Sequence, residues 1–437
     1  MKPYAFKILV VVLVIGSVII YSFKLSNRKV VNEYLSFEEV RDDFLELTGK
    51  IETGVPDAFY YTPKAEYESI KKTVSNQLRE GMTTRELFQV FYPLVQCLND
   101  AHFSIHLPDK LMEPNNTSCF PIRVIIHENR LYVLDDLSVE KQIKKGAEIL
   151  FINKLSAKEI ITKIRGTKET DKNKQLFFEY RTESVFHNRL YALFGFTENF
   201  EITTTDSTYF VKGINAGILN RQLDSVYEFK TLGTETAYLK INQLTLQPDT
   251  LKSMLEKDFA LLKKQAIRKL VIDIRGNMGG NSALAKNVFD YFMDTPYTLV
   301  AGVDYFHNGK RYAADTETKT HDPIFTKIKF KGKVILLSDV LTYSSAHMMQ
   351  VGFRHYNIGV TIGNESSEAL YITGEIKQTY LKNSKIELIA PTVNFKLPGY
   401  SEGQKKYYTP DYIIYPTLSD RLNDNDVILK RALNIVY

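Results

Sequence analysis

The chain has 437 residues, of which 44% are hydrophobic and 24% charged, and its formal net charge is +5. This length exceeds one compact core, so we expect two or three domains. The positive charges are scattered and form no long run of Lys and Arg, so the sequence indicates no nucleic-acid partner. The two cysteines, Cys97 and Cys119, form no Cys-x-x-Cys pair, which argues against a zinc ribbon or a thioredoxin-like site. One disulfide and two buried thiols are equally compatible with them.

The first thirty residues predict an uncleaved signal anchor. The run from Ile8 to Tyr21 carries no charge, and basic residues flank it: Lys2, Lys7, Lys24, Arg28 and Lys29. The run is shorter than the ~20 residues of a usual membrane span, but no small-x-small cleavage site follows it. We expect residues 1–30 to hold the chain on a membrane, with the rest exported to the periplasmic or extracellular side. The alternative, a cleaved signal peptide, exports the same residues.

Residues 31–115 predict a helical region. Ser36 and Glu39 have the spacing of a capping box, and apolar residues follow at helical spacing. A second helix is expected from about 65 to 79. A third begins at Thr83 or Thr84 and is kinked or interrupted by Pro93. It ends in a polar turn, Asn99-Asp100-Ala101-His102.

Residues 116–215 predict a small α+β module. Apolar residues alternate with polar ones from Cys119 onward, which indicates strands. A glycine turn at Gly146, a buried strand, a turn at Asn153 and a helix to Ile164 follow one another. This order resembles the carboxylate-binding half of a PDZ domain. The alternative is any other small α+β module.

Residues 216–437 predict an α/β core. Apolar strands are expected at 270–274, 334–337 and 358–362, with helices at 283–293 and 345–353 between them. Such alternation of strand and helix is typical of a layered domain with a largely parallel sheet.

A glycine-rich turn ends the first of these strands, in the segment Asp273-Ile274-Arg275-Gly276-Asn277-Met278-Gly279-Gly280. Adjacent glycines allow a ligand to approach the backbone closely and to meet its N–H groups. The segment has neither the Gly-Lys-Ser/Thr of a P-loop nor the spacing of a Rossmann turn, so nucleotide binding is poorly supported. An oxyanion hole for acyl transfer and a plain tight turn remain.

A serine lies at the next junction of strand and helix, in Leu341-Thr342-Tyr343-Ser344-Ser345-Ala346-His347. The Ser344 hydroxyl is expected at the carboxyl edge of the sheet, and the N–H of Ser345 at the start of a helix, where it can stabilise an oxyanion. The arrangement follows the logic of a nucleophile elbow without its Gly-x-Ser-x-Gly motif. The alternative is that Ser344 or Ser345 only caps the helix.

Together the two segments resemble the core of the tail-specific (C-terminal processing) protease and tricorn-core family. Ile362-Gly363 and Pro410-Asp411 fit the same pattern, and the upstream modules come in the right order. The resemblance covers about residues 36–436. It implies an α/β peptidase core with a ClpP/crotonase-like layered sheet, hydrolysis of peptide bonds through an acyl-enzyme, and no metal or organic cofactor.

Carried over by motif, Ser344 is the nucleophile, and the N–H groups of Ser345 and of Gly279 or Gly280 form the oxyanion hole. One branch of the family uses a lysine as base, but none lies between Ser344 and Lys377. The tricorn-like branch uses a histidine from the helical region, which implies His102.

That branch also has a late glutamate, which implies Glu402, with Glu365 and Glu368 as competitors. His347 stands where the family usually has glutamate, and we expect it to be a core or surface substitution. His106 lies four residues from His102, but no acidic partner or HExxH pattern supports a metal site.

The implied partners are polypeptides, captured by their C-termini through the PDZ-like module, and the membrane through the N-terminal segment. Two other functions fit the same fold: a catalytically inactive protein that binds exported polypeptides, and a hydrolase of non-peptide esters. Labelling of Ser344 by a serine reagent separates the first of these from a peptidase.

Overall fold

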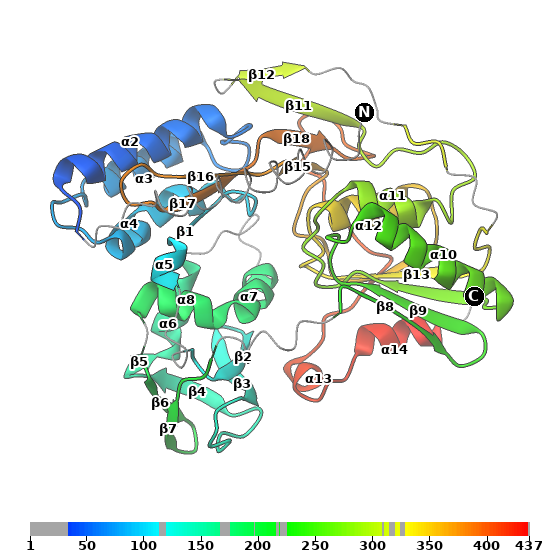
Figure 1. The fold of residues 1–437 in the computed structure, drawn as a ribbon, viewed down its shortest axis with the longest axis horizontal. Coiled ribbons are helices and arrows are strands. Elements are labelled where there is room, and N and C mark those ends of the chain that lie inside the picture. Colours follow the sequence, from blue (N-terminus) through cyan, green and yellow to red (C-terminus); the bar gives the residue numbers. More distant parts are fainter. Residues whose placement is uncertain are drawn as a thin grey trace, which may run out of the picture.

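The computed structural model describes residues 34–112, 119–166, 175–195, 197–215, 218, 225–307, 310–313, 320–323 and 328–435. The fold is mixed α/β with several sheets. Figure 1 shows helices of the N-terminal region at the upper left, a smaller sheet with helices below them, and a larger layered sheet on the right. The predicted anchor, residues 1–30, lies outside the described residues, and none of the described helices is long and apolar enough to cross a membrane.

Three helices form the N-terminal region: α2 (Phe37–Gly54), α3 (Lys64–Ser75) and α4 (Thr84–Gln96). Capping boxes at Ser36 and Thr83 satisfy the first N–H groups of α2 and α4. Pro93 lies inside α4, so the predicted interruption there is wrong. The apolar face of α4 is buried, and this packing offsets the backbone hydrogen bond that a proline removes.

A hairpin from the second half of the chain completes this region. Strands β16 (Lys377–Tyr380) and β17 (Glu387–Ala390) form the hairpin, and β17 pairs with β1 (Ser104–His106), which lies at the edge of the sheet. The hairpin's apolar side chains share one core with α4. Helix α5 (Asp109–Met112) follows β1. The turn that carries His102 is therefore held between helices and a sheet.

The middle module has one antiparallel sheet in the order β2-β3-β4-β6-β7. Its strands are β2 (Ile122–His127), β3 (Arg130–Asp136), β4 (Glu148–Ile152), β6 (Asn199–Thr204) and β7 (Thr208–Lys212), and β5 (Leu155–Ser156) pairs with β4. Helices α6 (Ala157–Arg165), α7 (Gln175–Ser184) and α8 (Phe186–Phe194) accompany it. The sequence predicted the helix that ends near Ile164, which is α6, but not α7 and α8; in the structure Ser156 caps α6.

The core sheet has the order β19-β14-β13-β10-β9-β8 and is parallel except at the β9–β8 pair. The strands are β8 (Tyr227–Leu232), β9 (Thr236–Ile241), β10 (Lys269–Asp273), β13 (Lys333–Ser338), β14 (Val360–Gly363) and β19 (Tyr412–Ile413). Helices α10 (Pro248–Lys264), α11 (Ala283–Phe289) and α12 (Ser345–His355) pack on one face, and α14 (Val427–Asn434) packs on the other (Figure 1). The predicted alternation of strands and helices produces this largely parallel sheet.

A second small sheet, in the order β12-β11-β18-β15, lies beside the core. Its strands are β11 (Gly302–His307), β12 (Lys310–Ala313), β15 (Tyr371–Gly374) and β18 (Val393–Lys396). Helix α13 (Leu418–Leu422) precedes α14. Because β15 leads directly into β16, this sheet connects the core to the N-terminal region.

Both cysteines are free thiols in the structure. Cys119 is buried and Cys97 half-buried, and burial raises the pKa of the Cys97 thiol to about 12. The sequence was compatible with one disulfide or with two thiols, and the structure has two unpaired thiols.

Candidate active site

Ser344 lies between β13 and α12 in a strained backbone conformation, with φ 54° and ψ −123°. A residue with a side chain rarely adopts this conformation, which costs of order 1–3 kcal/mol and is typical of functional sites. Its side chain makes no capping hydrogen bond to α12. The structure therefore gives no support to the alternative that Ser344 only caps the helix.

The glycine turn after β10 lies so close to Ser344 that it leaves no room for a side chain at Gly279. A Cβ at Gly279 (φ +95°) would lie 2.8 Å from the Ser344 Cβ. A Cβ at Gly280 (φ +136°) would lie 2.2 Å from the backbone oxygen of Leu244. Both positions therefore require glycine, and all three predicted oxyanion-hole residues lie around the nucleophile.

Hydrogen bonds hold the two segments together. The Ser345 hydroxyl donates to the Gly280 carbonyl at 2.7 Å. The Asn277 side chain is fully buried; it donates to the Ile241 carbonyl and accepts the Gly279 N–H at 2.9 Å. The Gly279 N–H is thus already engaged.

His102 follows α4 in a tight turn, where the Asp100 carboxylate accepts its backbone N–H at 2.9 Å. Its Nδ1 lies 3.1 Å from the Thr373 hydroxyl and 3.4 Å from the Tyr343 hydroxyl. The Thr373 hydroxyl also lies within hydrogen-bond distance of the Asp100 carboxylate. The His102 Nε2 is buried and has no hydrogen-bond partner among the described residues.

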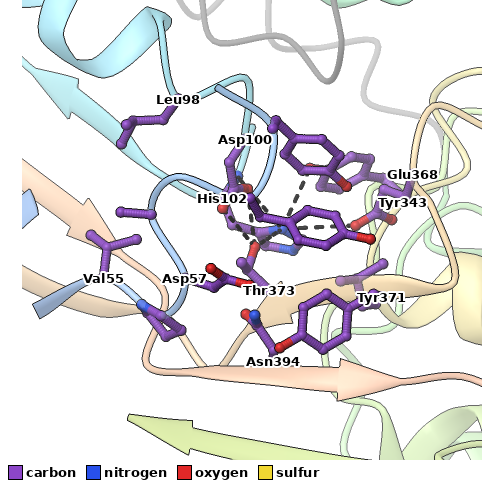
Figure 2. Close-up of a pocket in the computed structure, with 15 residues that line it drawn as sticks. Val55, Asp57, Leu98, Asp100, His102, Tyr343, Glu368, Tyr371, Thr373 and Asn394 are labelled. Atoms are coloured by element: carbon purple, nitrogen blue, oxygen red, sulfur yellow. Dashed lines mark hydrogen bonds and ion pairs between the residues drawn. The ribbon is translucent and has the colours of Figure 1, made fainter. Parts of the chain in front are cut away.

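Glu368 contacts both His102 and Ser344. Its carboxylate is almost fully buried, lies 3.7 Å from the His102 Nδ1, and accepts the backbone N–H of Ser344. Figure 2 shows Glu368 and Asp100 on different sides of the His102 ring. No local feature of the sequence indicated this contact, and Glu368 was predicted only as one of three candidate glutamates.

The structure places Glu402 elsewhere. It is exposed, and the Arg311 guanidinium donates to it at 2.9 Å, which lowers the pKa of its carboxyl. Glu402 lines neither of the two cavities that border His102. The ion pair with Arg311, which is distant in the sequence, holds Glu402 in this position. The spacing of residues along the chain does not reveal such a partner.

The other two histidines have structural surroundings. His347 is fully buried, with Nε2 2.9 Å from the Ala369 carbonyl and Nδ1 2.7 Å from the Gln350 amide, so it fastens α12 to the segment before β15. This agrees with the expected core role. The His106 Nε2 pairs with the Ser104 hydroxyl at 2.9 Å. Within the described residues, no group of His, Cys, Asp and Glu is arranged to hold a metal ion.

His102, Ser344, Ser345, Gly279 and Gly280 all line one cleft of about 710 Å³. A second, much smaller pocket of about 20 Å³ also borders His102 (Figure 2). Asp57, Asp100 and Glu368 line it, and burial raises the pKa of Asp57. The cleft thus brings together a strained serine, a glycine turn, and a histidine whose buried Nε2 has no hydrogen-bond partner among the described residues. These are the parts that acyl transfer requires.

Known proteins support this assignment. Residues 235–414 match the model of peptidase family S41, and no curated protein matches the sequence. Among solved structures, mature CPAF is similar with a TM-score of 0.64 at 12% identity, over 90% of this chain and 96% of that one. Its complex with lactacystin gives 0.66 at 12%, over 90% and 98%. A candidate peptidase from Parabacteroides merdae gives 0.52 at 13%, over 90% and 95%.

The likenesses to solved structures show the fold, and the family model covers the segment that carries both catalytic motifs. Ser344 and the glycine turn lie inside the matched residues, whereas His102 lies outside them. The resemblance to the tail-specific peptidases of family S41 that the paired motifs indicated is therefore confirmed by the family model over residues 235–414.

Proposed function

We propose that the protein hydrolyses polypeptides as a serine peptidase, with Ser344 as nucleophile and His102 as general base. One observation carries the proposal: a serine with strained backbone lines the same cleft as a histidine whose buried Nε2 has no hydrogen-bond partner among the described residues. The Ser344 Oγ attacks the substrate carbonyl and forms an acyl-enzyme, which water then hydrolyses. His102 takes the proton from Oγ and returns it to the leaving amine.

The surroundings of His102 favour Nε2 as the basic nitrogen. The Asp100 carboxylate accepts hydrogen bonds, so the Thr373 hydroxyl donates to it. The Thr373 oxygen then accepts a hydrogen bond from Nδ1–H, 3.1 Å away. With its proton on Nδ1, the neutral ring carries its lone pair on Nε2. No hydrogen bond joins His102 to the Ser344 hydroxyl within the described residues, and such bonds often tighten only when substrate binds.

Glu368 is the third member of the catalytic group in this proposal, in place of Glu402. Its buried carboxylate stabilises the imidazolium that forms when His102 accepts a proton, because opposite charges attract strongly away from water. The same carboxylate fixes the backbone of Ser344. Glu402, exposed and paired with Arg311, has no comparable effect on the cleft.

The oxyanion hole consists of the N–H groups of Ser345 and Gly280. Ser345 is the first residue of α12, where N–H groups have no partner within the helix and the helix dipole favours negative charge. Gly280 is preferred to Gly279, because the Gly279 N–H already donates to Asn277. The bond from the Ser345 hydroxyl to the Gly280 carbonyl keeps the two segments in register.

The middle module is a PDZ-like domain that captures polypeptide C-termini by strand addition. The β4–turn–α6 unit supports this, with Asn153 in a left-handed turn and Ser156 capping α6. Residues 1–30 anchor the exported chain to the membrane. The core has a ClpP/crotonase-like layered sheet, which the packing of helices on both of its faces supports.

Proteolysis of an unstructured reporter polypeptide tests the proposal. We expect the protein lacking residues 1–30 to cleave it, and Ser344→Ala and His102→Ala to lose at least about a thousandfold in kcat while remaining folded. Mature CPAF has been solved with lactacystin, so lactacystin and a fluorophosphonate are suitable probes for mass-spectrometric labelling of Ser344. A folded wild type that cleaves nothing and labels with neither reagent supports the inactive binding protein instead.

A further inference from the structure

The catalytic cleft continues past the base into a second hollow of about 270 Å³. His106 and Arg181 line both cavities, so the two are joined at these side chains. His106 belongs to β1 and Arg181 to α7. In Figure 1, β1 and α5 lie between α4 above and α8 below, which puts the hollow between the N-terminal region and the middle module.

One face of a β-sheet forms the floor of both cavities. Ser104 pairs directly with Ile389, and His106 with Glu387, across the β1–β17 ladder. Residues paired in this way point to the same face of a sheet. Ser104 and Ile389 line the cleft, Glu387 lines the hollow and His106 lines both. The sheet surface that forms the floor of the cleft therefore continues as the floor of the hollow.

Polar contacts hold the opposite wall in place. The Arg85 guanidinium of α4 donates to the carbonyls of Tyr191 and Ala192, at 2.6 Å and 2.8 Å, near the end of α8. The Gln89 amide donates to the Leu193 carbonyl at 3.2 Å. A cation at the carboxyl end of a helix stabilises its free carbonyls. The hollow is thus formed without a ligand.

The hollow combines an apolar part with polar and charged side chains. Phe88, Leu107 and Ala192 are almost fully buried and line it together with Met112 and Val185. Asp109, Arg189 and Glu387 add charges of both signs. The apolar part of the hollow is suited to a large apolar side chain of a ligand. The mixed charges give no net preference for an acidic or a basic one.

We propose that this hollow is a remote anchor subsite, which holds a large apolar side chain of the substrate polypeptide. The proposal rests on the proposed peptidase function, and continuity with the catalytic cleft identifies the substrate as its occupant. His106 comes four positions after His102, and the chain is extended over Ser104–His106. Because an extended chain advances about 3.3 Å per residue, we expect the anchored side chain to lie about four residues from the cleaved bond.

Cleavage-site mapping tests this directly. The substrates are peptides of uniform small polar sequence with a single Phe, moved one position at a time, and mass spectrometry locates the cut made by the protein lacking residues 1–30. We expect the cut to move with the Phe, at a constant spacing of about four residues on one side of it. A cut whose position ignores the Phe would overturn the anchor subsite.

Two neighbouring variants supply the control. Val185→Phe fills the hollow, whereas Ser184→Phe adds the same ring at the adjacent exposed position, which lines neither cavity. Burial of a Phe side chain is expected to raise kcat/KM by about tenfold over the peptide without it. Val185→Phe should abolish this gain, and Ser184→Phe should keep it. An equal gain in both variants contradicts the proposal.

Binding to the Ser344→Ala protein separates this inference from the proposed function. Fluorescence anisotropy of the same peptides should show about tenfold tighter binding when Phe is present, and Val185→Phe should remove the difference. If the wild type cleaves no peptide but this difference is found, the peptidase function fails and the subsite stands. If peptides are cleaved and the difference is absent, the subsite fails and the peptidase stands.

Discussion

The proposed nucleophile, Ser344, and the proposed base, His102, line one cleft, but different interactions hold them. Ser344 is held by backbone geometry: a strained φ of 54°, and a glycine turn so close that no Cβ fits at Gly279. His102 is held by polar side chains that reach its Nδ1 or its backbone, namely Asp100, Thr373, Tyr343 and Glu368. We therefore expect activity to fall when volume is added around Ser344 (the nucleophile side). Around His102 (the base side), we expect it to fall when hydrogen bonds or charge are removed.

Gly279→Ala is expected to have the largest effect on activity among changes around Ser344. The added Cβ would meet the Ser344 Cβ at 2.8 Å and the Tyr343 carbonyl oxygen at 2.9 Å, and the backbone there has φ +95°. We expect kcat to fall by about a thousandfold, because small displacements of reacting groups are costly. Steady-state kinetics on the reporter polypeptide measures the fall, and circular dichroism checks that the variant is folded.

The matched control is Gly276→Ala in the same turn. Gly276 also has positive φ (+74°), but a Cβ there has open space around it. This variant should lose about 1–2 kcal/mol of stability from the backbone conformation alone and keep kcat within a few-fold. A comparable loss of kcat in both variants would show that the turn's backbone conformation matters, and not its contact with Ser344.

Glu368→Gln tests the base side. The amide is close in shape to the carboxylate but carries no charge, so it removes the attraction to the imidazolium and leaves the volume unchanged. We expect kcat to fall by about a hundredfold with a small change in KM, since the charge develops on His102 only during the reaction.

Glu402→Gln makes the same chemical change at the other candidate glutamate. It should change kcat less than about threefold, because exposed ion pairs such as Glu402–Arg311 contribute little. If Glu402→Gln is the damaging variant and Glu368→Gln is not, the active enzyme holds its catalytic glutamate in an arrangement different from this structure.

The two sides also differ in how well the sequence predicts them. The glycine turn, Ser344 and Ser345 lie within two short segments, each at the end of an apolar strand, and local pattern was enough to select them. Parallel neighbours in a sheet bring such strand ends to one edge, which is why β10 and β13 place both segments together. The core sheet was predictable for the same reason.

The base side depends on contacts that no local pattern contains. Thr373 lies 271 residues from His102 in the chain, and it reaches His102 because β15 leads into the hairpin that pairs with β1. Glu368 has no sequence feature that distinguishes it from Glu365 or Glu402. Its burial against Ser344 results from the packing of α12 beside the segment before β15. Tertiary packing, not propensity, selects the glutamate here.

The carboxylate of Glu183, which is largely buried and lies outside the catalytic cleft, has the smallest expected effect on activity. Glu183 accepts the backbone N–H of Ile126 at 2.7 Å and pairs with Arg421 of α13, and burial raises its pKa to about 7. A carboxyl whose pKa is higher in the folded state than the usual ~4.3 stabilises the fold fully below pH ~4.3, and this stabilisation is lost as the pH rises through about 7. Glu183→Gln should remove a fall of about 3 kcal/mol in the free energy of unfolding over that interval. Urea unfolding at several pH values measures it.

Because Glu183 does not line the catalytic cleft, kcat near neutral pH should stay within about twofold, and a large loss would instead show that the junction of α7 and α13 supports the cleft.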